Sequence, residues 1–84
     1  MSLDEQEAAI ESRDDFVRFA RALLADFREN GETWENGTLE RYLESLAAWV
    51  EAMDRVYRNR GETLPSQPSW RMLGEILYAA SMYE

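Results

Sequence analysis

The sequence predicts an all-α fold, a small bundle of three principal helices, and three observations support this. Three stretches repeat apolar residues at three- and four-residue steps, which gathers those residues on one side of a helix. Asn30-Gly31 and Asn59-Arg60-Gly61, which are typical of helix ends, separate the stretches. Residues that cap helix starts precede them. We therefore expect helices at about 13–29, 38–58 and 69–83, in a single domain covering residues 1–84.

The acidic leader, residues 1–11, carries a weaker helical pattern than the rest of the chain. Ser2 and Glu5 match a capping box, and Ala8, Ala9 and Ile10 are the only apolar cluster. The pattern adds a short leading helix at 3–10, with ends that can fray.

The first principal helix is expected to begin after Ser12, which forms a second capping box with Asp15. Its apolar side is formed by Phe16, Phe19, Ala20, Leu23, Leu24 and Phe27, with Arg18, Arg21 and Arg28 opposite. Asn30-Gly31 is the expected stop, near Glu29, because Gly tolerates the positive φ common just after a helix.

The loop from Glu32 to Gly37 leads into the second helix. Trp34 is expected to cover the edge of the core, since a large aromatic in a short loop gains by burial. Either Asn36 or Thr38 can cap the helix that follows. Glu35 is the one acid that we nominate for acid-base chemistry, because Trp34 and Leu39 flank it and favour its partial desolvation. The alternative is a carboxylate that stabilises the helix N-terminus.

The second helix shows the clearest amphipathic pattern and is the expected spine of the fold. Its apolar arc consists of Leu39, Tyr42, Leu43, Leu46, Trp49, Val50, Met53, Val56 and Tyr57. Four acids share one flank and form an acidic ridge: Glu40, Glu44, Glu51 and Asp54. Glu51 with Arg55 and Asp54 with Arg58 have the spacing of i,i+4 ion pairs. A solvated helix face is the alternative to a binding role for this ridge.

The third helix follows a stiff connector that contains Pro65 and Pro68. Ser69 is its expected N-cap and Trp70 its first core residue. Apolar residues cover about half of its circumference, which exceeds what one neighbouring helix covers. Either this helix lies between the other two, or its extra apolar surface binds a second copy or a partner.

Charge and composition exclude several functions. The chain has 9 Arg, no Lys and 17 acids, a net charge of −8 that argues against nucleic acid and against an anionic membrane surface. It has no Cys and no His, and no motif for a phosphate, a metal or a nucleophile. We expect no enzyme activity, no cofactor and no metal. The acidic N-terminus and the absence of a long apolar run favour a cytoplasmic location.

Several sequence elements recur together in a known family. These are Trp34-Glu35-Asn36-x-Thr38-Leu39-x-x-Tyr42-Leu43, then Trp49 and Tyr57, then Pro65-x-x-Pro68-x-Trp70, and finally Leu77-x-Ala79-Ala80-x-x-Tyr83-Glu84. Over residues 15–84 the chain resembles a family of small bacterial all-helical proteins of unknown function. The resemblance implies the extent of the fold and no particular activity.

Three functional hypotheses remain. The first is a protein-binding module that recognises a basic partner, as immunity proteins and inhibitors do. The second is a structural domain that self-associates through the third helix, with Tyr78 and Tyr83 at the interface. The third is a small-ligand pocket lined by Trp34, Tyr42, Trp49 and Trp70. The candidate binding surface comprises Trp34, Glu35, Asn36, Glu40, Glu44, Glu51, Asp54 and Trp70.

Overall fold

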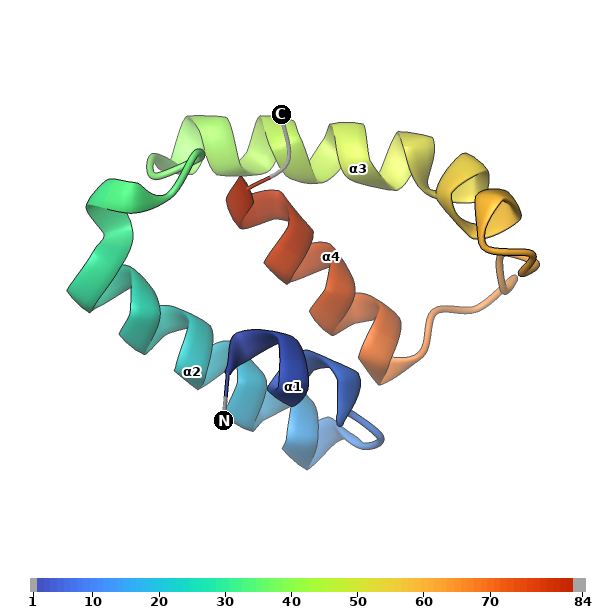
Figure 1. The fold of residues 1–84 in the computed structure, drawn as a ribbon, viewed down its shortest axis with the longest axis horizontal. Helices are drawn as coiled ribbons and strands as arrows, with labels where there is room; N and C mark the ends of the chain where they lie inside the picture. Colours follow the sequence, from blue (N-terminus) through green and yellow to red (C-terminus); the bar gives the residue numbers. More distant parts are fainter. Residues whose placement is uncertain (1, 83–84) are drawn as a thin grey trace.

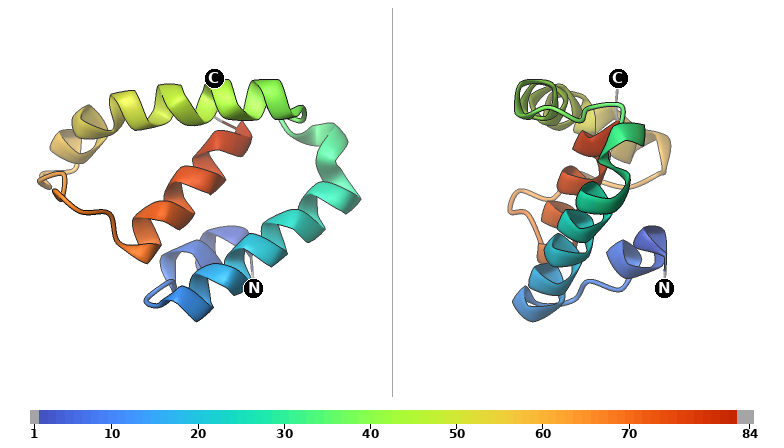
Figure 2. Two further views of the ribbon diagram at one scale, coloured as in Figure 1. Left: turned by 180° about the vertical axis from the view of Figure 1, so that it is seen from behind. Right: turned by 90° about the vertical axis from the view of Figure 1, so that its left-hand side faces the viewer.

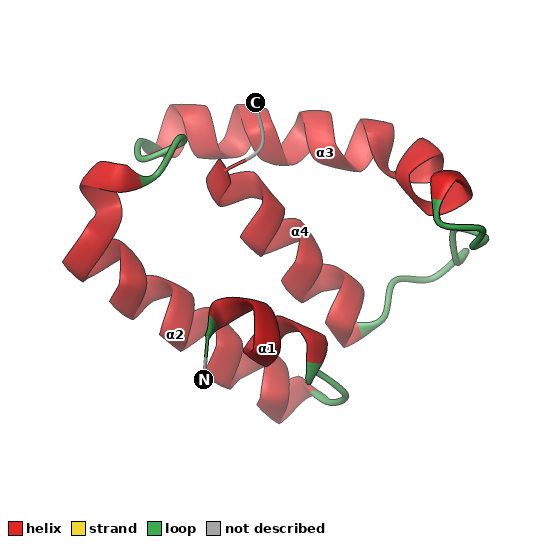
Figure 3. Ribbon diagram, viewed as in Figure 1, coloured by secondary structure: helices red, strands yellow, loops and turns green. Residues whose placement is uncertain are grey.

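The computed structural model describes residues 2–82, and its only regular secondary structure in that range is helical. The helices are α1 (Leu3–Ala8), α2 (Arg13–Asn30), the 3-10 helix η1 (Gly31–Thr33), α3 (Leu39–Asn59) and α4 (Trp70–Met82), as Figures 1 and 3 show. The predicted all-α fold, the three principal helices and the short leading helix are confirmed. Tyr83, which the sequence placed in the third helix and at a dimer interface, lies outside the described residues.

α4 is the central helix. It packs against α1, α2 and α3, whereas α2 and α3, over their described lengths, do not pack on one another. Figures 1 and 2 show the same arrangement, with α4 crossing the space between the two longer helices. The prediction that the third helix lies between the first two is confirmed, but the expected spine, α3, is a flank of the fold and α4 is its centre.

The molecule is flat. Its principal extents are 35 × 27 × 17 Å, and an α-helix with side chains is about 10–12 Å across. α2, α4 and α3 form one layer, and α1 stands on one side of it near the start of α2 (Figure 2, right). The accessible surface is 6033 Å² for a 9.8 kDa chain, about 850 Å² more than the roughly 5,200 Å² typical of a monomer of this mass.

Two small apolar clusters hold the layer together. The first joins α1, α2 and α4 around Ile10, Phe19 and Leu23, which are 2%, 1% and 6% exposed. The second joins α3 and α4 around Met53, Tyr57 and Met72. Ile10 reaches the first cluster because position 74 of α4 is glycine: a methyl group there would overlap Cδ1 of Ile10. The acidic leader therefore supplies one of the most buried side chains of the core.

Side-chain caps define the helix starts. The hydroxyls of Ser2, Ser12 and Thr38 each accept a hydrogen bond from the backbone N–H three residues later, at 3.2 Å. Ser69 accepts one from Met72 at 3.1 Å, as predicted. Of the two candidates for the cap of α3, Thr38 is therefore the cap, and Asn36 is not.

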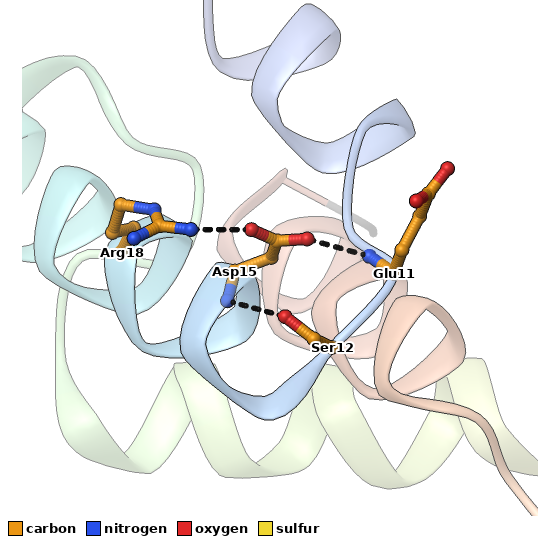
Figure 4. A network of polar contacts seen from close by, with 4 residues as sticks. All are labelled: Glu11, Ser12, Asp15 and Arg18. Carbon is orange, nitrogen blue, oxygen red and sulfur yellow. Dashed lines mark hydrogen bonds and ion pairs between the residues drawn. The ribbon is translucent and has the colours of Figure 1, made fainter.

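The start of α2 is reinforced by Asp15 (Figure 4). Its carboxylate accepts a hydrogen bond from the backbone N–H of Glu11 at 3.1 Å and forms an ion pair with Arg18. The hydrogen bond from Arg18, together with that from Glu11, lowers the pKa of Asp15. The contact with Glu11 also ties the segment that follows α1 to the first turn of α2.

The helix ends at Asn30-Gly31 and Asn59-Arg60-Gly61 differ. Gly61 has φ +76°, and the N–H groups of Gly61 and Glu62 donate to the carbonyls of Arg58 and Tyr57 at 2.9 and 2.8 Å, a Schellman motif. Gly31 has φ −58° and begins η1, so the positive φ expected there is not adopted. The ring of Phe27 occupies the space that a side chain at Gly31 would need.

Candidate functional site

Trp34 covers the edge of the core, as predicted. Its indole Nε1–H donates to Oδ2 of Asp26 at 2.8 Å, and its ring meets that of Phe27 edge to face at 5.1 Å. It also packs against the first apolar cluster. These contacts fix the loop at the corner where α2 gives way to α3.

Asn36 holds the end of α4. Its backbone N–H donates to the carbonyl of Ser81 at 3.2 Å, and its side-chain Nδ2 donates to the carbonyl of Ala80 at 3.0 Å. The last four carbonyls of a helix have no partner within the helix. Asn36 satisfies two of them, so it caps the C-terminus of α4 rather than the N-terminus of α3.

Glu35, between these two anchors, is solvent-exposed. This exposure differs from the partial burial that the sequence predicted for Glu35.

A small apolar pocket lies at the α2–α3 corner, and we call it the corner pocket. Its volume is about 220 Å³, below the roughly 300–1,000 Å³ of typical small-molecule sites. Aromatic and aliphatic side chains dominate its walls, and it would accommodate one large apolar side chain. The lining residues are Phe27, Trp34, Asn36, Gly37, Thr38, Leu39 and Tyr42.

The four aromatics proposed to ring a ligand pocket are placed apart. Only Trp34 and Tyr42 line the corner pocket. Trp49 packs against the second apolar cluster, and Trp70 packs against Phe16 with ring centroids 5.6 Å apart. Tyr42 itself donates a hydrogen bond to the carbonyl of Leu77 at 2.9 Å, which ties α3 to α4, and burial raises its pKa.

The acidic ridge of α3 is solvent-exposed along its whole length. Asp54 pairs with Arg58 at 3.4 Å, but Glu51 and Arg55 form no ion pair, contrary to the spacing rule. Beside the ridge runs an exposed apolar stripe, in which Leu39, Leu43 and Val50 are 73%, 53% and 42% exposed. The ridge comprises Glu40, Glu44, Glu51 and Asp54, all classed as exposed.

α2 carries a second exposed apolar stripe, which the sequence did not reveal. Val17, Leu24 and Phe27 are 40%, 47% and 41% exposed, although Leu24 and Phe27 were expected in the core. Arg21 and Arg28 lie about 60° and 40° around the helix from Leu24, so they border this stripe as the acids border that of α3. The only feature of the sequence that indicated this stripe was Val17, an apolar residue next to the arginine side of the helix.

The two stripes lie on one face of the layer. Following the chain in Figure 1, α4 is to the right of both α2 and α3. Seen along each helix from its N-terminus, successive residues advance clockwise, and the exposed stripe follows the core residues in that sense. Because the core residues face α4 on the right, the stripe faces away from the viewer of Figure 1. The corner pocket joins Phe27 to Leu39. Leu24 is also half a rotation from Asp15, which contacts the α1 side. We call this surface the apolar face: Val17, Leu24, Phe27, Leu39, Leu43 and Val50.

A polar cluster surrounds Glu75 of α4, with groups from α1 on one side and from the end of α3 on the other. Glu75 accepts hydrogen bonds from Tyr57 Oη at 3.3 Å and from Arg60 at 3.1 Å. Glu7 is near it, and its Oε1 is buried without a hydrogen-bond partner. Burial, and then the charge of Glu75, raise the pKa of Glu7, with Asp4 adding to the rise and Arg71 and Arg60 opposing it.

We expect Glu7→Gln to stabilise the protein at neutral pH. A carboxyl whose pKa is raised by folding contributes stability below its unfolded pKa, near 4.5, and loses it as pH rises through the folded pKa. The variant removes that loss, so the two proteins should differ at pH 7 and converge below pH 4.5. Urea denaturation at both pH values measures this, with exposed Glu11→Gln as the control. A variant less stable than wild type at pH 7 would contradict the raised pKa.

None of the described helices combines the length and apolar character needed to span a membrane. Within residues 2–82, no three Asp, Glu, His or Cys side chains gather to hold a metal ion.

These features define a small all-helical domain with an exposed apolar face and charged edges. The chain belongs to the family of unknown function DUF7660, whose model matches residues 12–84. No curated protein and no solved structure matches the chain. The match begins at Ser12, so it includes α2, α3 and α4 and leaves out α1 and Ile10.

Proposed function

We propose that this protein is a non-enzymatic protein-binding module that acts through its apolar face. The observation that carries the proposal is that six large apolar side chains on α2 and α3 are 40–73% exposed on one side of a flat layer. Exposed apolar patches mark protein interaction sites. The corner pocket adds a concavity for one anchoring side chain, the usual energetic centre of such surfaces.

A basic partner is the version of this function that the α3 side supports. Four exposed carboxylates run beside the stripe of Leu39, Leu43 and Val50, and the net charge is −8. A basic amphipathic helix would place its apolar side on the stripe and its cations against the ridge, the way helices bind in grooves. An immunity-protein or inhibitor role in a bacterial cytoplasm is part of this version. The small corner pocket favours this over a metabolite site.

The test is a titration with a basic amphipathic helical peptide and a scrambled peptide of identical composition, followed by Trp fluorescence, because Trp34 lines the corner pocket. It uses chain concentrations at which the protein is monomeric. We expect saturable binding of the amphipathic peptide and at least about tenfold weaker binding of the scramble, since only the former matches the stripe. Leu43→Glu should abolish the difference, and Leu64→Glu, in the exposed connector, should not. Equal affinity for both peptides, or binding of neither, would overturn the proposal.

A further inference from the structure

The two charged edges of the apolar face have opposite sign. On α2 the order around the helix runs from buried Phe19 and Leu23, through the apolar stripe, to Arg28 and Arg21. On α3 it runs from buried Met53, through the stripe, to the acidic ridge. Because α4 lies between the two helices, both charged rows are on the outer edges of the layer. One edge of the face is therefore basic, and the other is mainly acidic, with Arg58 paired to Asp54 within it.

We propose that the apolar face binds a second copy of this chain, with α2 of each copy against α3 of the other. A two-fold axis roughly parallel to α4 produces this arrangement when two faces are apposed. Arg21 and Arg28 of one copy then meet the acidic ridge of the other, and the same contact repeats across the axis. Such an isologous interface requires a self-complementary surface, and opposite charges on the two edges supply it.

The surface area agrees with this occupant. The chain exposes about 850 Å² more than a typical monomer of its mass, and a standard interface buries about 800 Å² on each partner. A face-to-face pair would also cover the side of the layer that α1 leaves open. Each three-helix layer would then pack against the corresponding layer of the other copy. Domains usually consist of at least two such layers around a core.

The location differs from the self-association expected from the sequence. That hypothesis used the wide apolar arc of the third helix, but α4 uses this arc to pack against α1, α2 and α3. Most of the exposed large apolar residues lie on α2 and α3, whereas α4 exposes Trp70 and Met82 at its two described ends. The inference rests on the proposed function, because it assigns an occupant to the same apolar face.

The experiment is a charge exchange measured by sedimentation equilibrium. Wild type is expected to approach twice 9.8 kDa as its concentration rises. Arg21→Glu with Arg28→Glu places acid against acid, and Glu44→Arg with Glu51→Arg places base against base. Each double variant should dimerise at least about tenfold more weakly than wild type, since apposed like charges are strongly unfavourable. Mixing the two should restore a dimer, because every contact between them then joins opposite charges.

Two features separate charge pairing from the effect of net charge. The Glu→Arg variant reduces the net negative charge, so general repulsion alone would make it dimerise more strongly than wild type, opposite to the expectation here. The control variant, Arg18→Glu with Arg41→Glu, has the same net charge as the Arg21/Arg28 variant but alters residues outside the apolar face. Its dimer affinity should therefore fall much less than that of the Arg21/Arg28 variant. Circular dichroism confirms that each variant is folded.

The outcomes are distinct. A wild-type chain that stays at 9.8 kDa at high concentration, or variants whose mixture remains monomeric, would overturn the dimer. If that monomer binds the amphipathic peptide described above, the proposed function stands with a different protein as partner. If it binds neither its own copy nor the peptide, both proposals fail.

Discussion

Replacing Ile10 by Ala is expected to lower the free energy of unfolding by about 2–4 kcal/mol, a large share of the 5–15 kcal/mol typical of a domain. Ile10 is 2% exposed and fills the space beside Gly74, between α1, α2 and α4. Removing its side chain leaves a cavity that the rigid helices around it cannot close. Exposed Leu64→Ala is the control and should change stability by less than about 0.5 kcal/mol.

The partner substitution at position 74 makes the test sharper. In wild type, Gly74→Ala should destabilise by about 1–3 kcal/mol, because the new methyl overlaps Cδ1 of Ile10. In the Ile10→Ala background the same change should stabilise, since the overlap is gone and Ala is about 1 kcal/mol better than Gly in a helix. Urea denaturation of the four proteins completes a double-mutant cycle. Additive effects would show that Ile10 does not occupy this site in solution.

The second large effect is expected from Asn36→Asp. The side-chain Nδ2–H of Asn36 donates to the carbonyl of Ala80, at the C-terminal, partially negative end of α4. An ionised carboxylate there has no proton to donate and is repelled by the carbonyls. We expect a loss of about 2–3 kcal/mol at pH 7, compared with about 1–2 kcal/mol for Asn36→Ala, which only removes the bond.

The pH dependence distinguishes the two Asn36 variants. A protonated carboxyl can donate to Ala80, so folding would raise the pKa of the new acid above its unfolded value of about 3.9. The stability of Asn36→Asp should therefore be higher below that value and fall as pH rises, relative to Asn36→Ala at each pH. Urea midpoints at pH 3.5 and pH 7 measure this. Equal stability of the two variants at both pH values would contradict the capping role of Asn36.

The helices and their starts could be predicted because local rules govern them. Capping by Ser12 and Ser69 depends on residues only three apart, and the wide apolar arc of the third helix indicated its central position. The cap of α4 could not be found in this way, because Asn36 and Ala80 are 44 residues apart. Locally, Asn36 looks like a cap for the helix that follows it. Ile10, at the end of the short apolar cluster Ala8-Ala9-Ile10, offered no helical periodicity that predicts its burial.

The exposed apolar face was missed for a different reason. Periodicity shows which side of a helix is apolar, but not how much of that side a neighbour covers. In this fold α4 covers α2 and α3 on one flank only. Leu24, Phe27, Leu43 and Val50, which the periodicity predicted to be in the core, are therefore 41–53% exposed. The sizes of such uncovered strips depend on the number of packing partners, which no single helix encodes.

The central place of α4 also has a consequence for the order of folding. α3 packs on no described helix except α4, and α4 follows α3 in the order of the described helices. During synthesis, the apolar side of Leu39–Asn59 therefore has no helix to pack against until Trp70–Met82 has been synthesised. Stepwise folding from the N-terminus is limited to α1 on α2, and the remainder forms in one late event. A nascent chain stalled before Trp70 is expected to be open to proteolysis throughout its second half.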